Sequence, residues 1–289
     1  MNIRIKKIVW SLVLVIIFFA SEAQAFSISP LKYESTIASG ESQNFLVSVE
    51  NNSDNEHSYQ LVVTGARQDE SGRLVFDKNI DIAENWVNFE KNEVSLKARE
   101  KKDFLFTISV PKNTPPGGHY LGMGIAEKND RGVGGSLMTV VAFQVTGIAN
   151  ESLRLDNFYP VSKYFFDNNW RYFLQLKNVG NIDLAMSGSV QVLSLNNKDV
   201  FYKTVDLGSK LFSGSNRTVD FIISPEKNKI ILPGKYQAVL TIHYGLTNQE
   251  IVSVVNFWYL PIWFMLSVLI LIILVVSFFI FKKTKHEMV

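Results

Sequence analysis

The sequence predicts an all-β protein: two tandem immunoglobulin-like β-sandwiches followed by one transmembrane α-helix. Short runs that alternate apolar and polar residues recur along the chain, separated by clusters of turn-forming residues, as is typical of antiparallel sandwiches. No long amphipathic helical pattern interrupts them. Near the C-terminus, Ile262 to Phe281 carries no charge, and about 20 such residues are enough for a helix to cross the hydrocarbon core of a bilayer.

The first 25 residues have the pattern of a secretory signal peptide. A basic start is followed by the apolar run Ile8–Ala20 and by the small-x-small site Ala23–Ala25. We therefore expect residues 1–25 to be removed and the mature chain to begin at Phe26. An uncleaved signal would instead leave two membrane spans.

The C-terminal apolar run predicts a transmembrane helix over residues 258–281. Trp258, Tyr259 and Trp263 form its aromatic edge, and the basic residues of the short tail 282–289 follow directly. Aromatic rings favour the headgroup layer and lysines favour the cytoplasmic side, so the pattern predicts a single-pass type I protein with its ectodomain outside and its C-terminus in the cytoplasm. The alternative, a buried core helix, would normally keep a polar stripe.

Charge and cysteine content exclude several classes of function. Residues 26–256 contain 23 basic and 25 acidic residues, so the predicted ectodomain has no basic excess with which to bind nucleic acid. The chain has no cysteine, which excludes disulfides, zinc–thiolate sites and thiol nucleophiles. Because animal surface immunoglobulin domains normally keep a cystine, these features favour a bacterial cell surface.

Residues 26–148 are predicted to form the first sandwich. Apolar side chains alternate in the runs Gln43–Glu50, Ser58–Thr64 and Lys102–Val110, as expected of half-buried strands. Clusters such as Asn51–Asp54 and Asn113–Gly118 predict the turns between strands.

Residues 149–257 are predicted to form the second sandwich. Two strands, Phe158–Phe166 and Tyr172–Lys177, flank a turn at Asp167–Trp170 and predict a hairpin. The last strand, Glu250–Phe257, runs almost directly into the apolar helix. We therefore expect the second domain to stand close to the bilayer and not on a flexible stalk.

Several short sequence motifs of the first domain resemble those of bacterial surface proteins of the WxL-interacting type. These motifs are Trp86–Phe89, Val94–Leu96, Phe104–Pro111 and Pro116–Gly122. That family combines a signal peptide, two immunoglobulin-like domains, one C-terminal helix and a short basic tail. The resemblance implies peptidoglycan binding by the first domain and binding of host or surface proteins by the second.

The first domain also resembles the N-terminal domain of periplasmic pilus chaperones, through Ile28–Lys32, the alternating strands and a late proline-rich turn. This resemblance implies that an edge strand completes the client's sheet, while two basic residues in a cleft hold the client's terminal carboxylate. Lys32 matches the first basic residue. The second is missing, because Ser136–Gly147 contains no lysine or arginine.

Candidate binding residues lie beside the predicted turns. The rings of Trp86, Tyr120 and Trp170 are candidates to stack on a sugar or to anchor a partner, or alternatively to fill the cores of the sandwiches. His119 follows a Pro-Gly-Gly turn and is a candidate ligand residue or a packing residue. The histidines share no metal-ligand spacing and no serine lies in a nucleophile elbow, so the sequence predicts neither a metal or cofactor site nor an enzyme.

These observations predict a non-enzymatic, membrane-anchored binding or scaffold protein of the cell surface. Its expected partners are the membrane and either peptidoglycan or another surface protein. The alternative is a membrane-held, chaperone-like factor that assembles secreted surface proteins by β-strand addition. An aromatic-lined face would favour wall binding, whereas an open edge strand with a basic anchor would favour assembly.

Overall fold

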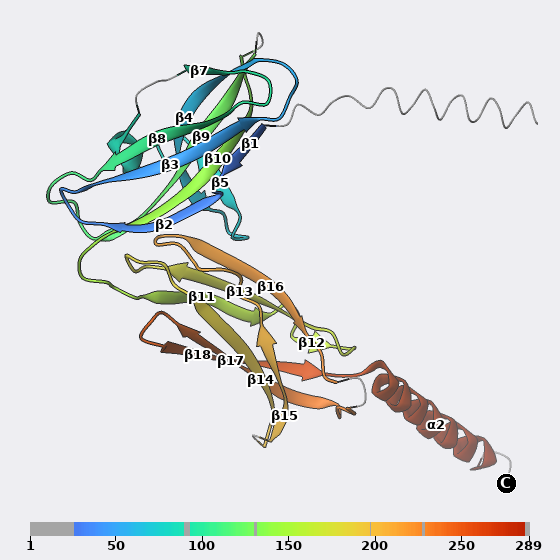
Figure 1. The fold of residues 1–289 in the computed structure, drawn as a ribbon. Helices are drawn as coiled ribbons and strands as arrows, with labels where there is room; N and C mark the ends of the chain where they lie inside the picture. The colour runs from blue at the N-terminus through green and yellow to red at the C-terminus, as the bar shows by residue number, and fades with distance from the viewer. Residues whose placement is uncertain (1–25, 90–92, 130–131, 197, 227–228, 287–289) are drawn as a thin grey trace, which may run out of the picture.

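The fold class predicted from the sequence is confirmed in a computed structural model, which describes residues 26–89, 93–129, 132–196, 198–226 and 229–286. Four sheets form two sandwiches, and one apolar helix follows them (Figure 1). The predicted signal peptide, residues 1–25, and the last three residues of the predicted tail, 287–289, lie outside the described residues.

The first sandwich packs two sheets face to face. One sheet has the order β1 (Phe26–Ser29), β3 (Ser42–Asn51), β8 (Lys101–Ser109), β6 (Val87–Asn88). The facing sheet has the order β2 (Lys32–Ile37), β10 (Gly132–Val145), β9 (Gly117–Asn129), β4 (His57–Gln68), β5 (Leu74–Asp77), with β7 (Glu93–Leu96) also paired to β4. A short 3-10 helix, η1 (Ile82–Trp86), leads into β6.

Period-two alternation fills the core of this sandwich. Phe45 of β3 lies opposite Phe106 of β8, and both side chains are buried. The intervening residues of the same strands, Leu46 and Leu105, face outward and stay exposed. Successive side chains of a strand point to opposite faces, so the alternation seen in the sequence decides which face is buried.

The second sandwich pairs a small sheet with a larger one. The small sheet has the order β11 (Leu153–Pro160), β13 (Trp170–Asn178), β16 (Asn216–Ile223). The larger sheet has the order β12 (Tyr164–Phe165), β18 (Gln249–Tyr259), β17 (Gly234–Tyr244), β14 (Met186–Ser194), β15 (Asp199–Val205).

The predicted strand Phe158–Phe166 is wrong as a single element. The antiparallel pairing of β11 with β13 ends at Pro160, and Tyr164–Phe165 then pairs in parallel with the end of β18 in the other sheet. The last hydrogen bond of this ladder runs from the Val161 N–H to the Arg171 carbonyl, one residue beyond Pro160. The segment therefore crosses from one sheet to the other close to the start of the helix.

The helix α2 (Ile262–His286) follows β18 after only Leu260 and Pro261. Its bounds differ from the predicted 258–281, because Trp258 and Tyr259 are still paired with β17 as the last residues of β18 and the helix continues into the basic tail. Residues 262–280 are the one stretch of the described chain that is helical, long and apolar enough to cross a membrane, and none of it is buried in the protein. Backbone hydrogen bonds from Leu260 N–H to the Phe165 carbonyl and from Ile262 N–H to the Phe166 carbonyl join the start of α2 to the β12 segment. Its 0% burial and its length are consistent with a single membrane anchor.

We expect Trp170→Ala to destabilise the protein by about 3–5 kcal/mol, since the change removes a fully buried aromatic side chain. Trp170 is 0% exposed, its ring lies 4.9 Å from that of Phe257, and its indole N–H donates to the Asp167 carbonyl at 3.0 Å. Denaturant unfolding of the full chain in detergent micelles measures the effect. Tyr202→Ala, at an exposed ring of β15, is the control and should cost far less; equal losses would contradict this account of the core.

Candidate functional site

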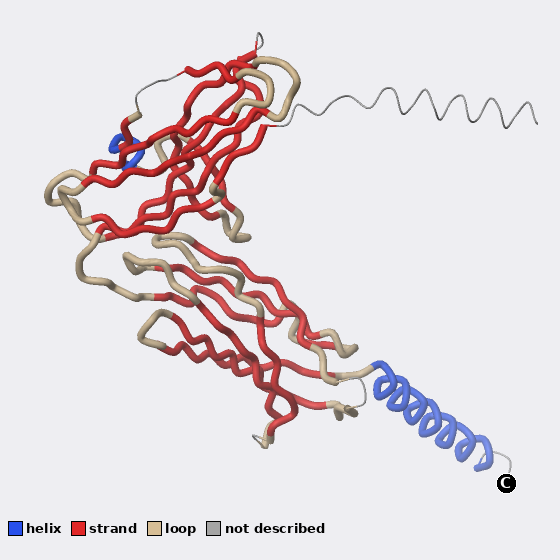
Figure 2. The backbone as a smooth tube through the Cα atoms, viewed as in Figure 1, coloured by secondary structure: helices blue, strands red, loops and turns tan. Residues whose placement is uncertain are grey.

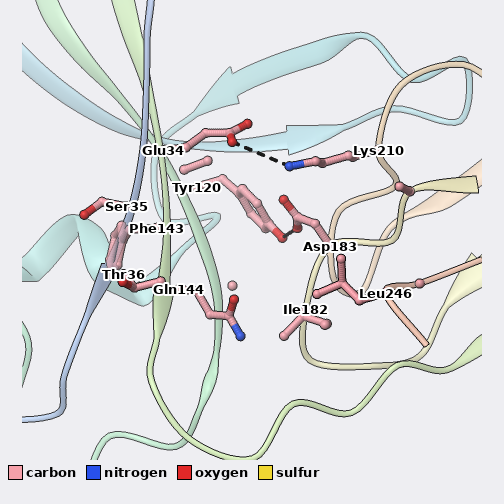
Figure 3. Close-up of a pocket in the computed structure, with 14 residues that line it drawn as sticks. Glu34, Ser35, Thr36, Tyr120, Phe143, Gln144, Ile182, Asp183, Lys210 and Leu246 are labelled. Atoms are coloured by element: carbon pink, nitrogen blue, oxygen red, sulfur yellow. Dashed lines mark hydrogen bonds and ion pairs between the residues drawn. The ribbon is translucent and has the colours of Figure 1, made fainter. Parts of the chain in front are cut away.

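A cleft of about 460 Å³ lies between the two sandwiches. Strands β2 and β10 of the first sandwich form one wall, and turns of the second sandwich around Asp183, Lys210 and Leu246 form the other (Figure 3). Buried contacts between the two domains lie next to this cleft.

Tyr120 makes the central contact between the domains. Its ring stacks on that of Phe212 in the second domain, with centroids 3.9 Å apart and planes within 3° of parallel. Its hydroxyl donates to Asp183 Oδ1 and accepts from the Ser213 N–H at 2.9 Å. A Cβ at Gly118 would lie only 2.5 Å from this hydroxyl, so the ring position requires a glycine there.

Burial shapes the electrostatics of this contact. It raises the pKa of the Asp183 carboxyl, and this effect outweighs the hydrogen bond from Tyr120, which acts in the opposite direction. Burial also raises the pKa of the Tyr120 hydroxyl, and the neighbouring Asp183 charge raises it further. The Tyr120 hydroxyl therefore keeps its proton and remains a donor.

A second set of polar contacts surrounds Gln68, at the end of β4. Its side-chain amide donates to the Lys210 carbonyl at 2.9 Å and accepts from the Phe212 N–H at 3.0 Å. The guanidinium of Arg217, a residue that is only 3% exposed, donates to the same Gln68 oxygen and to the Leu207 carbonyl. These bonds satisfy polar groups that the docking of the two domains removes from water.

Two lysines converge on Glu34, on the edge strand β2. Lys32 bonds Glu34 Oε1, and Lys210 of the second domain lies 3.5 Å from Glu34 Oε2 (Figure 3). The hydrogen bond and charge of Lys32, followed by the charge of Lys210, lower the pKa of the Glu34 carboxyl. Lys32, the candidate for the first basic residue of a carboxylate-binding pair, thus already pairs with a carboxylate of this chain. The second lysine at this place, Lys210, comes from the second domain and not from β10.

His119 lies in a packed cluster next to the cleft. Its Nδ1 is 2.8 Å from Asp81 Oδ1, and its ring packs against Trp86 at 4.8 Å and Phe143 at 5.3 Å. Burial alone would raise the pKa of Asp81, but hydrogen bonds from His119 and from two backbone N–H groups together lower it. Both His119 and the half-buried Trp86 therefore pack against neighbouring side chains, which is the second of the two roles that the sequence allowed for each of them.

The sequence-derived candidates do not form one surface. Trp170 is fully buried in the second core, so the exposed position considered for its ring is wrong; the small-sheet strand β13 points it inward. Tyr120 is buried between the domains. Trp86 and His119 touch each other, while Lys32 is exposed on β2 and pairs with Glu34.

The edge of β10 is open along its first half. Strand β9 pairs with β10 on one side as far as Val145, but on the other side β2 covers only Val140–Val145. Val140 N–H donates to the Leu31 carbonyl and therefore faces the β2 side. Because strand backbones alternate with period two, the N–H and C=O groups of Ser136 and Met138 face that side as well, where no described strand pairs with them.

Sequence reasoning missed the residues that join the domains, namely Gln68, Asp183, Lys210, Phe212 and Arg217. Gln68 and Phe212 are 144 positions apart, and no local pattern indicates that they meet. One signal was present: Asp183 lies between Ile182 and Leu184, both buried, and an acidic residue in such a setting needs a partner.

No protein-family model matches the sequence, and no curated protein matches it. Among solved structures, the class 5 fimbriae chaperone CfaA is 14% identical, covering 80% of this chain and 98% of its own, with a TM-score of 0.43. The SafA pilin–SafB chaperone complex of Salmonella enterica gives 11% identity, 83% and 98% coverage and a TM-score of 0.39. These comparisons concern the fold alone, and membership of the WxL-interacting family stays a prediction.

We expect Tyr120→Phe to loosen the contact between the domains. The change leaves the Asp183 carboxyl and the Ser213 N–H without their buried partner, which costs about 1–3 kcal/mol. Unfolding of the full chain in micelles and spin-label distances across the cleft are the measurements, and the distance distribution should broaden. Tyr202→Phe, at an exposed ring, is the matched control. An unchanged distance distribution in Tyr120→Phe would contradict the role given to the Tyr120 hydroxyl in holding the domains together.

Proposed function

We propose that this chain is a non-enzymatic, membrane-held, chaperone-like assembly factor that binds a segment of a secreted protein by β-strand addition. The observation that carries the proposal is the open half of β10, residues 132–139. A partner segment in extended conformation would satisfy the backbone groups of Ser136 and Met138 and would continue the sheet β4–β9–β10.

The open edge has chemical features that suit a strand partner. Ser136 is exposed, and Leu137 and Met138 are half-buried, so an added strand would meet both backbone groups and partly apolar side chains. No lysine, arginine or proline lies in residues 132–139, and these are the residues that commonly block edge pairing in natural sheets. The β9–β10 register is irregular between Val133 and Ser136, and Thr139 is buried with its hydroxyl bonded to the Pro30 carbonyl. The part of this edge that would template another chain is therefore Ser136–Met138.

The anchor and its orientation form the second part of the proposal. The unburied apolar helix α2 would hold the chain in the membrane, with both sandwiches outside the cell and the short basic tail inside. A factor tethered in this way meets secreted segments as they leave the membrane, before their own sheets are complete.

The aromatic positions favour assembly over wall binding. Stacking on a sugar needs accessible ring faces, whereas Trp170 is buried, Tyr120 is stacked on Phe212 and Trp86 packs against His119. Retention of the full chain on purified peptidoglycan sacculi, without capture of a protein segment, would instead support the cell-wall scaffold.

Ser136→Pro should weaken client binding about threefold to tenfold, because it removes one hydrogen-bond donor on the open side at a net loss of about 0.5–1.5 kcal/mol. The N–H of Ser136 points away from β9, so the existing ladder is kept. The measurement is in-cell photo-crosslinking from position 135, where a side chain added at Gly135 meets no atom within 4 Å.

Ser136→Ala is the matched control, since it keeps the N–H and should keep the crosslinks. A probe at Leu105, exposed on the opposite sheet of the same domain, controls for position. Equal yields at positions 135 and 105, or equal losses in the two Ser136 variants, would contradict strand addition.

The orientation predicts which residues react with reagents outside the cell. The chain has no cysteine, so each introduced thiol is the only one present. We expect Leu31→Cys, at an exposed side chain of the first domain, to react with a membrane-impermeant maleimide in intact cells. A cysteine added after Val289 should react only after lysis, and the reverse pattern would overturn the type I orientation.

A further inference from the structure

The strand register places several turns of the second sandwich at the same end of the domain as the start of α2. Gly234 lies opposite Tyr259, and Ser194 lies opposite Tyr236, so the turns before β17 and after β14 are at the same end as the end of β18. The β12 segment pairs with this end directly. Figures 1 and 2 show these turns at the end of the second domain that faces the helix, opposite the first domain.

Large apolar side chains project from these turns into solvent. Ile230 is 85% exposed, and the other members are exposed as well. We call this set the apolar rim; it comprises Val161, Tyr164, Phe166, Leu195, Ile230 and Leu232. Turns that face water usually carry glycine, proline and small polar residues, so a group of apolar tips from three separate turns indicates a non-aqueous neighbour.

The rim is tied to the helix by the backbone. The carbonyls of Phe165 and Phe166 accept hydrogen bonds from Leu260 N–H and Ile262 N–H, at the last residues before the helix and at its start. Two residues before Leu260, the Trp258 N–H donates to the Lys163 carbonyl. The β12 segment cannot move away from the point where α2 begins without breaking these bonds.

Amphipathic groups accompany the apolar tips. The ammonium of Lys163 lies 5.9 Å from the centre of the Tyr164 ring, and Lys235 lies opposite Trp258 in the β17–β18 register. Trp258 and Trp263 flank the start of α2 and are partly exposed. Tryptophan, tyrosine and lysine with an apolar stem are the side chains that favour the headgroup layer of a bilayer.

We propose that the apolar rim is a lipid-binding surface that inserts into the headgroup–acyl boundary of the leaflet from which α2 enters. The inference rests on the membrane-anchoring part of the proposed function. A phospholipid surface is the occupant because the β12 segment of the rim is hydrogen-bonded to the start of the spanning helix and the other turns lie at the same end of the domain. The rim gives the ectodomain three further points of contact, and the second sandwich therefore stands on the bilayer at a fixed tilt instead of swinging about one helix.

The test uses the full chain in vesicles of phosphatidylethanolamine and phosphatidylglycerol. Ile230→Cys and Leu195→Cys, in two different turns, each carry an environment-sensitive fluorophore, and the vesicles contain lipids spin-labelled near the acyl carbonyl. At both positions we expect the emission maximum to shift to shorter wavelength and the spin-labelled lipids to quench most of the fluorescence. Leu246→Cys is the matched control: it is 93% exposed in the turn at the other end of β17 and β18, and should be unaffected.

Flotation of the same samples separates the two proposals. If the chain floats with the vesicles but positions 230 and 195 are quenched no more than position 246, the lipid-binding rim is overturned and the anchor stands. If the chain does not float, the anchor fails and the rim fails with it. Quenching at positions 230 and 195, without quenching at position 246, supports the proposal that the apolar rim binds lipid.

Discussion

The hydrogen bonds of the Tyr120 hydroxyl to Asp183 and Ser213 hold the two sandwiches in one relative orientation. The cleft, the approach of Lys210 to Glu34 and the packing of Gln68 all depend on that orientation. Since the second sandwich is joined to α2 through two residues, the same contact also sets where the open half of β10 lies relative to the helix. The open half of β10 and the helix α2 are thus related through the same contacts between the domains.

Much of the fold could be predicted from local pattern. Strands such as β3 and β8 bury every second residue, so alternation alone shows both the strand and its inner face. The apolar helix could be predicted from the length of the apolar run and its lack of charge alone. The split of Phe158–Phe166 between two sheets was not predictable in this way, because β12 is two residues long and is defined by its partner β18.

The candidate site was harder to predict for a physical reason. Aromatic residues beside turns look alike in a sequence whether they fill a core, as Trp170 does, or join two domains, as Tyr120 does. The open edge of β10 is defined by where β2 stops, which is a matter of strand register. Lys32 was noticed in the sequence, but Lys210, which pairs with the same Glu34, is 178 positions away and approaches only because the domains dock.

The direct passage of β18 into α2 has a mechanical consequence. Strand β18 is hydrogen-bonded to β17 along its full length, from Gln249 to Tyr259, and β12 flanks its last residues on the other side. A force that pulls the sandwiches away from α2 therefore acts along the strand, and all of these bonds share it in shear instead of opening one by one. The join between sheet and helix therefore resists a pull along the helix axis better than a join through a free loop would.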